Sequence, residues 1–310
     1  MTAPTEFTAG RETHRRPRGY AAWRPQARTR QLLEQVEDVL DEYSAHLPLS
    51  VRQIFYRLVA TVEYPKDELA YQRLGNLLVN ARRARLVPFG SIRDDGVTHR
   101  EVPWFSGVEG FWDDVGARAR RYRRDRQVGQ KQYIEVWCEA AGMVPQLAKA
   151  VGWLSVPVFS SGGFLSLTAV RVVVDRACSR DVPTVLLHVG DFDPSGEAIF
   201  TSMVEDAAAF LAEDRVIHTQ QLEAVRVALT AEQVEEYALP TAPAKKSDGR
   251  SARWNGETCQ LEALPPDALA DLVEEGIVSY IDRGRFESQR TIEGADRVQL
   301  LLALPEGGAA

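Results

Sequence analysis

The sequence predicts a two-domain protein that joins a small, mainly helical α+β unit to a larger α/β unit. Three observations lead to this prediction. Amphipathic helical patterns fill the first third of the chain, apolar strands alternate with helices after Lys131, and the net charge changes sign between these two parts. With 310 residues, 45% of them hydrophobic, the chain is long enough to form two buried cores.

The N-terminal part starts with a basic arm, residues 1–30, which is rich in Arg, Pro and Thr and has little apolar periodicity. Such a segment indicates a flexible arm that could follow phosphates, although a plain solvated tail has the same composition. From Gln31 to Tyr43, apolar residues recur at steps of three and four, which predicts a helix that Pro48 then separates from the next one.

Two further helices and a hairpin complete the first domain, which we place at residues 31–110. Ser50 can cap the second helix, and a third helix is expected from about Lys66 to Leu86. Asp94–Asp95–Gly96 predicts the turn of a hairpin over 87–102. Helix, turn, basic helix and hairpin are the layout of a winged-helix (CAP-like) domain, whose third helix enters the DNA major groove. The same layout could also be a plain scaffold.

The charge distribution supports a polyanionic partner for the first half. Residues 1–131 carry 23 Lys and Arg against 17 Asp and Glu, whereas residues 132–310 carry 14 against 27. This asymmetry favours nucleic acid on the basic half and bound cations on the acidic half. The candidate DNA-binding residues lie on the third helix and in the basic linker 111–131, and they are Arg73, Arg82, Arg83, Arg85, Arg121 and Arg124.

The second domain, residues 132–305, has the alternation that is typical of a parallel sheet covered by helices on both faces. Its expected strands are 133–138, 156–160 and 184–189, and the last of these is the most apolar. Thr230 and Gln233 form a capping box before a short helix. A polar loop over 240–255, a helix over 261–280 and a weak tail are expected after it.

Three carboxylates follow two strands of this domain. Glu139 comes directly after the first strand, and Asp191 and Asp193 follow the most apolar one. Ligands bind at the carboxyl ends of the strands in open α/β sheets, so these side chains are expected to converge. An Asp-x-Asp pair alone could equally cap a helix, but three converging carboxylates repel one another unless a divalent cation lies between them. Magnesium, which prefers oxygen ligands, is the cofactor that we expect.

The same residues resemble a known family. Glu139 followed by Asp191-x-Asp193-Pro-x-Gly196 is similar to the Toprim domain, a Rossmann-like parallel sheet, in the form found in the A subunit of topoisomerase VI. Two stretches between them, 163–166 and 168–171, resemble that subunit as well. Val51 to Tyr56 resembles the Arg-x-Ile-(Tyr/Phe)-Tyr segment of its winged-helix domain. The group also includes the meiotic double-strand-break transesterase.

The resemblance implies a function. Tyr56 occupies the place of the tyrosine that attacks DNA, and Arg52 matches the arginine four residues before it. The expected activity is a magnesium-dependent, type IIB topoisomerase-like cleavage of double-stranded DNA (isomerase class) that forms a phosphotyrosyl link. In the family, the tyrosine of one protomer meets the metal of the other, so a homodimer is expected.

This sequence departs from the family at two positions. Ala140 stands where the family often has Gly or Lys, and Leu165 replaces a usual proline. Together with the short chain and the lack of an ATPase domain, these features fit the stand-alone mini-A proteins of bacteria, phages and plasmids. Cleavage is then expected, whereas strand passage and an ATPase partner of the B type stay open.

Two alternatives from other classes stay open. A Toprim nuclease would cleave plasmid or phage DNA with water in place of Tyr56, and a non-catalytic DNA-binding protein would serve a partner machine. Cys138, Cys178 and Cys259 form no Cys-x-x-Cys pair, which argues against a disulfide framework or a zinc finger. We expect a cytoplasmic protein on nucleoid, plasmid or phage DNA, because neither a signal core nor a membrane-spanning run is present.

Overall fold

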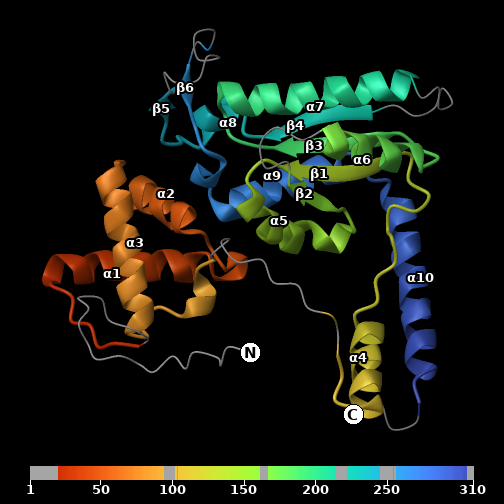
Figure 1. Cartoon of the computed structure of the whole chain (residues 1–310), viewed down its shortest axis with the longest axis horizontal. Coiled ribbons are helices and arrows are strands. Elements are labelled where there is room, and N and C mark those ends of the chain that lie inside the picture. Colours follow the sequence, from red (N-terminus) through yellow and green to blue (C-terminus); the bar gives the residue numbers. More distant parts are fainter. Residues whose placement is uncertain are drawn as a thin grey trace, which may run out of the picture.

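The structure is a computed structural model that describes residues 20–93, 102, 104–160, 167–213, 222–244, 254 and 256–305. Most of the predicted basic arm (1–19), the expected turn of the hairpin (94–101 and 103) and the family-like stretch 163–166 lie outside these residues. Figure 1 shows a helical N-terminal unit beside a larger part that contains the sheet.

The N-terminal unit contains three α-helices. The second begins after the predicted cap Ser50, whereas the first begins at Ala27, within the segment 1–30 that was expected to be a flexible arm. Ser50 Oγ accepts a hydrogen bond from the Gln53 N–H, and the Gln53 side chain accepts one from the Ser50 N–H, which closes the predicted cap. Asp67 caps the third helix through the Ala70 N–H at 2.7 Å. The elements are α1 (Ala27–Glu42), η1 (Ser44–His46), α2 (Val51–Val62), α3 (Glu68–Arg83) and η2 (Phe89–Ser91).

Of the expected wing over 87–102, only residues 87–93 and 102 are among the described residues. In its described part, Phe89–Ser91 is a 3₁₀ turn, and Ile92 forms a single parallel bridge with Leu49. The winged-helix assignment therefore stays a prediction, supported by three helices whose buried faces pack together.

The larger part has the predicted parallel sheet, with strand order β2-β1-β3-β4 and every pair parallel. All six residues of β3 are buried, as its apolar run predicts. The sheet strands and the helices among them are β1 (Tyr133–Cys138), η3 (Ala141–Met143), α5 (Val144–Val151), η4 (Gly152–Leu154), β2 (Val158–Ser160), α6 (Leu167–Cys178), β3 (Thr184–Val189), α7 (Pro194–Glu213) and β4 (Leu222–Ala228). The predicted α/β class is thus confirmed for the larger part.

Smaller elements follow the sheet. The predicted capping box of Thr230 and Gln233 begins α8. A two-stranded antiparallel pair follows, of which β5 lies within the expected loop 240–255 and β6 lies just after it. These elements are α8 (Ala231–Glu236), β5 (Ala242–Pro243), β6 (Glu257–Thr258), η6 (Leu261–Ala263), α9 (Pro266–Val278) and α10 (Arg283–Leu302).

Side chains alternate between the two faces of the sheet along each strand. Apolar side chains therefore lie on both faces, and helices cover both. Helices α5 and α9 pack on one face, and α6 and α7 pack on the other (Figure 1). The first face receives Ile134, Val136, Cys138, Val185, Leu187 and Val189, and the second receives Trp137 and Leu186.

Helix α10 corrects the prediction of a weak tail after Tyr280. It runs beside α4 (Val108–Arg120), as Figure 1 shows, and it buries only Phe286 and Glu293. Ion pairs hold it: Arg126 to Glu293 at 2.8 Å, and Arg124 to Asp296 at 2.9 Å. A helix that is held mainly by charge has little apolar periodicity, and for this reason the sequence pattern misses it.

Helix α2 joins the two predicted domains. Gln53 Nε2 donates to Gln146 Oε1 on α5 at 2.7 Å, and the buried Arg57 donates to the Ala263 carbonyl in η6. One apolar cluster continues from Leu58 on α2 to Leu147 on α5. The helix that carries Tyr56 is therefore fixed against the sheet-containing part. Among the described residues, no helix combines the length and apolar character that a membrane crossing requires.

Candidate functional site

The three predicted carboxylates lie at the same edge of the sheet. Strands β1 and β3 are hydrogen-bonded neighbours, and Glu139 and Asp191 follow their carboxyl ends. The backbone at Gly196 is close to two of the acids: a Cβ atom there would lie 2.8 Å from Glu139 Oε2 and 3.4 Å from Asp193 Oδ1. Glu139 and Asp193 thus face the same small space, which only a glycine leaves open.

Burial and mutual repulsion act on these acids. Burial, followed by the charge of Asp193, raises the pKa of Glu139, and Glu139 Oε2 is buried without a hydrogen-bond partner among the described atoms. Burial also raises the pKa of Asp191 to about 7, and the charges of Glu262, Glu139 and Asp193 add to the effect. A nearby cation would stabilise the ionised form of these buried carboxyl groups and so lower their raised pKa values.

Two of the acids also have structural hydrogen bonds. Asp193 Oδ1 accepts from the Gly196 N–H at 2.6 Å at the start of α7, which is the capping role that the sequence left open. Asp191 Oδ1 accepts from the Leu261 N–H at 2.9 Å. In the described part of the chain, no three His, Cys, Asp or Glu side chains are arranged as a ready set of metal ligands. The oxygen-only donors and the unpartnered Glu139 oxygen nevertheless fit magnesium chemistry.

Glu262 is a fourth carboxylate in this region, and the sequence reasoning missed it. It lies on η6, its charge raises the pKa values of Glu139 and Asp191, and it forms an ion pair with Arg52 at 3.6 Å. No strand precedes it, and it is far from the other acids in the sequence. Only the packing of η6 against α2 reveals its position.

Tyr56 lies on α2 and has 7% of its surface exposed. Its hydroxyl donates to Gln260 Oε1 at 2.8 Å, and its ring contacts Phe55 edge-on. Burial raises the pKa of Tyr56 to about 12; Arg52 opposes this, while Cys259, Glu262 and Asp191 add to it. The phenol is therefore neutral at ordinary pH, although Arg52 acts in the direction of a phenolate.

A pocket of about 260 Å³ opens beside Tyr56. It contains two cations, Arg52 and Lys66, and the Lys66 ammonium lies 5.9 Å from the centre of the Tyr56 ring. Lys66 also donates to the Thr241 carbonyl, and burial lowers its pKa. No pattern in the sequence indicates a site role for Lys66 or Gln260. The lining residues are Arg52, Phe55, Tyr56, Lys66, Asp67, Glu68, Tyr71 and Gln260.

The candidate DNA-binding arginines of the first domain lie on and just after α3. Arg73 and Arg85 are exposed, and Arg82 and Arg83 are half-buried. The guanidinium of Arg82 lies over the Phe89 ring, and that of Arg85 lies 4.1 Å from the centre of the Tyr20 ring. Both arginines contact an aromatic ring, and among the described residues no carboxylate forms an ion pair with Arg82 or Arg85.

The two candidates in the basic linker differ from each other. Arg121 is exposed and donates to the Ala117 carbonyl at 3.3 Å. Arg124 is bound to α10 through Asp296 and Gln289. Arg124 therefore helps to hold α10 in place, whereas Arg121 is accessible to a ligand.

Neither protein-family models nor curated protein sequences give a match to the chain.

Proposed function

We propose that the protein is a magnesium-dependent enzyme that cleaves double-stranded DNA with Tyr56 and resembles the topoisomerase VI A subunit. One observation carries the proposal: the loop from Cys259 to Ala263 contacts both the candidate nucleophile and the carboxylates. Gln260 binds the Tyr56 hydroxyl, and the next residue, Leu261, binds Asp191. Because one loop contacts both the nucleophile and one of the acids, the arrangement supports chemistry on a phosphate that binds near both.

The pocket beside Tyr56 is suited to a phosphodiester. Arg52 and Lys66 supply two positive charges at its lining, next to the Tyr56 ring, and the lining also includes Glu68 and Asp67, whose carboxylate caps α3. A phosphate that binds Arg52 competes with Glu262 for the same guanidinium, because Arg52, whose side chain is 45% exposed, forms an ion pair with the mostly buried Glu262 at 3.6 Å.

The reaction transfers a phosphoryl group from a sugar oxygen to Tyr56. The Tyr56 oxygen forms a bond to phosphorus, the bond between phosphorus and the sugar oxygen breaks, and the phenol proton is released as that sugar oxygen becomes a hydroxyl. The number of phosphoester bonds is unchanged, so the break can be resealed. Arg52 stabilises the developing negative charge, because its field already opposes the rise in the Tyr56 pKa.

Glu139, Asp191 and Asp193 are the residues that would hold magnesium, and the ion would neutralise charge on the phosphate when bound. Asp191 must be ionised for this role, and a neighbouring cation favours its ionised form. Because each chain supplies one Tyr56, cleavage of both DNA strands requires two copies, and we propose a homodimer.

A covalent adduct tests the proposal. Plasmid DNA is incubated with the protein and Mg²⁺, denatured with SDS, and examined for protein that stays attached to DNA ends. The proposal predicts end-labelled DNA bound to the protein and released only after proteolysis. Cleavage without attached protein would select the nuclease, and binding without cleavage would select the non-catalytic DNA-binding protein.

The nuclease remains the second candidate because of one observation. Tyr56 is buried, hydrogen-bonded and neutral, whereas the acids at the sheet edge do not depend on it. Water activated at these acids would cleave DNA without a contribution from the phenol.

A further inference from the structure

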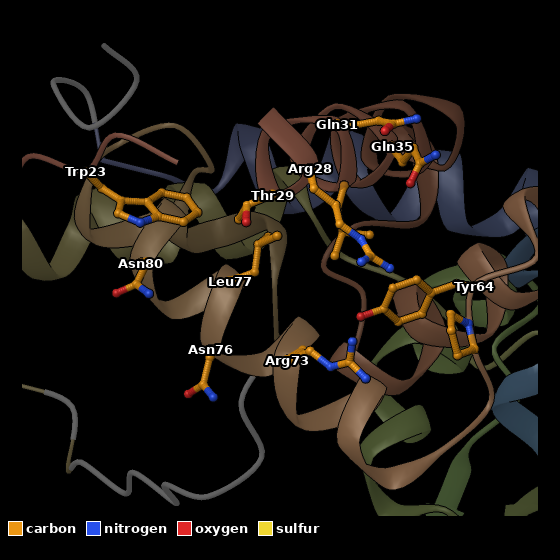
Figure 2. Close-up of a pocket in the computed structure, with 12 residues that line it drawn as sticks. Trp23, Arg28, Thr29, Gln31, Gln35, Tyr64, Arg73, Asn76, Leu77 and Asn80 are labelled. Carbon is orange, nitrogen blue, oxygen red and sulfur yellow. The ribbon is translucent and has the colours of Figure 1, made fainter. Parts of the chain in front are cut away.

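The N-terminal unit has a second pocket, of about 460 Å³, between α1 and α3 (Figure 2). This volume is within the range of small-molecule sites, about 300–1,000 Å³. None of its lining residues also lines the pocket beside Tyr56. The lining residues are Trp23, Arg28, Thr29, Gln31, Leu32, Gln35, Tyr64, Pro65, Arg73, Asn76, Leu77 and Asn80.

The two helices present matching polar faces to this pocket. Helix α1 contributes an arginine and two glutamines, and α3 contributes an arginine and two asparagines, with the same steps of three and four residues. Such steps place side chains on one face of a helix. Leu32 and Leu77 supply apolar surface between these faces. The polar residues are Arg28, Gln31 and Gln35 on α1, and Arg73, Asn76 and Asn80 on α3.

The charge of the pocket is positive. No carboxylate belongs to its described lining, and neither Arg28 nor Arg73 has an ion-pair partner in the described ranges. Arg73 donates its Nε–H to the Leu69 carbonyl of its own helix. Arg52 and Arg124, in contrast, are both paired with carboxylates. Two arginines that share a pocket without a counter-charge favour an anion.

The two guanidinium groups converge on one end of the pocket. Figure 2 shows Arg28 and Arg73 reaching from their two helices toward the Tyr64 phenol, with Trp23 at the opposite end. Burial raises the pKa of Tyr64 and the charge of Asp67 adds to this rise, while Arg73 and Arg28 oppose it, so the fields of both arginines reach the phenol oxygen. The Tyr64 hydroxyl itself donates to the Ala70 carbonyl at 3.0 Å and so is engaged away from a ligand.

The rest of the lining is suited to a nucleobase. Asparagine and glutamine amides both donate and accept hydrogen bonds, which is what the edge of a base requires. The Trp23 indole is half-buried and offers a flat apolar surface on which a base can stack. A phosphate at one end and a base toward the other are the two parts of a nucleotide.

We propose that this pocket binds a nucleoside phosphate, with the phosphate at Arg28 and Arg73 and the base between the amides and Trp23. The ligand is either a free nucleotide or one unit of a single DNA strand, since both carry the same groups. A base that is paired within duplex DNA cannot enter a pocket of this kind. The inference does not depend on cleavage by Tyr56.

Binding to the full chain is measured by calorimetry with the four deoxynucleoside 5′-monophosphates, with a short single-stranded oligonucleotide, with a duplex of the same sequence and with inorganic phosphate. Saturable binding of a mononucleotide identifies a free-nucleotide site, and binding of only the single-stranded oligonucleotide identifies a strand site. Either result supports the proposal if phosphate alone binds more weakly. The proposal would be overturned if inorganic phosphate bound as tightly as the nucleotide probes, or if neither the mononucleotides nor the single-stranded oligonucleotide bound.

Variants place the ligand in the pocket. Arg28→Gln and Arg73→Gln should each weaken binding by about tenfold, because each removes a charge-assisted hydrogen bond. Arg30→Gln, the same change on the same helix at a residue outside the lining, should have little effect. Asn76→Ala should change the preference among the four bases. An equal loss in Arg30→Gln would show that charge alone binds the probe and would contradict the proposal. Each variant's thermal unfolding is measured alongside, so that a loss of folding is not taken for a loss of binding.

Discussion

The Tyr56 hydroxyl and the Asp191 carboxylate are bound by adjacent residues of one loop. Tyr56 donates to the Gln260 side chain at 2.8 Å, and Asp191 accepts from the Leu261 N–H at 2.9 Å. Cys259, just before them, pairs with Phe192 through two backbone hydrogen bonds. The loop is therefore fixed to Phe192, the residue between Asp191 and Asp193. Through this loop, the Tyr56 hydroxyl is held at a defined position relative to the carboxyl edge of the sheet.

Replacing Tyr56 tests its role as nucleophile. Tyr56→Phe removes one oxygen and keeps the ring packing, so folding and DNA binding should change little, while cleavage and the covalent adduct should both disappear. Tyr71→Phe is the matched control, because Tyr71 lines the same pocket and its ring packs edge-on against Phe55. This control should cleave normally. Cleavage by Tyr56→Phe at the normal rate would make water the nucleophile.

Asp191 should make stability depend on pH. Its pKa is raised from 3.8 to about 7 in the folded protein, so between these values the folded state binds more protons than the unfolded state. The free energy of unfolding should therefore fall as pH rises from about 4 to 7, and Asp191→Asn should remove this part of the dependence. Urea unfolding of both proteins at pH 5 and pH 8 measures it.

Magnesium should oppose that loss of stability. At pH 8 the ion binds ionised carboxylates and should raise the midpoint of unfolding of the wild-type protein, whereas at pH 5 protons compete with it. Asp191→Asn should show a much smaller effect at pH 8. A magnesium effect of the same size in both proteins, or none in either, would contradict a metal site at these acids.

The local features of the chain could be predicted from the sequence, and the contacts between distant segments could not. The apolar run of β3 and the capping residues Ser50 and Thr230 act through their immediate neighbours, so their patterns are visible in the sequence. Gln260 lies 204 residues from Tyr56, and its contact depends on how η6 packs on α2. Nothing in the sequence near Gln260 encodes that packing.

The candidate site shows the same division. Glu139, Asp191 and Asp193 follow strands, and the rule that neighbouring parallel strands end at one edge is enough to bring them together. Glu262 reaches the same region from a 3₁₀ turn, to which no such rule applies. The basic run predicted a DNA contact for Arg124, and the contact that the sequence did not indicate is the ion pair of this side chain with Asp296.

The salt dependence of DNA binding should separate the arginines. Each neutralised phosphate contributes a slope of about −0.9 to log K against log salt, so Arg82 and Arg83 changed together to Ala should reduce the slope by about 1.8. Arg124→Ala should leave the slope unchanged and lower stability instead, since its charge is already paired with Asp296. A slope that stays the same in the double variant would place the DNA elsewhere.

Glu135 should stabilise the fold. It is fully buried in β1 and accepts hydrogen bonds from Arg176 and Trp137, and it forms an ion pair with Arg180 at 2.9 Å. Burial acts to raise the pKa of Glu135, but these partners outweigh it and hold the pKa below its ordinary value. The stabilisation is therefore present above the unfolded-state pKa and is lost as pH falls through the folded-state value.

Glu135→Gln should lower the free energy of unfolding at pH 7 by about 3 kcal/mol, because it leaves the positive charge of two arginines uncompensated. Glu287→Gln is the control: the same change in the exposed pair with Arg290 should cost less than about 1 kcal/mol. Equal losses in the two variants, measured by urea unfolding, would mean that the Glu135 pair contributes no more than a surface pair.

The last prediction concerns which protomer supplies each part of the site. Both ends of the connection through Gln260 and Leu261 belong to one chain, and the charge of Asp191 acts on the Tyr56 phenol within that chain. If cleavage uses this arrangement, Tyr56→Phe chains mixed with Asp191→Asn chains should stay inactive, because no protomer keeps both residues. The two variants are denatured and refolded together so that mixed dimers form, and the covalent adduct is measured against wild-type protein treated in the same way. Recovery of about a quarter of the wild-type activity, as expected if half of the dimers are mixed and each has one intact site, would contradict the intrachain arrangement. It would instead support the exchange of tyrosines between protomers that the resemblance to topoisomerase VI implies.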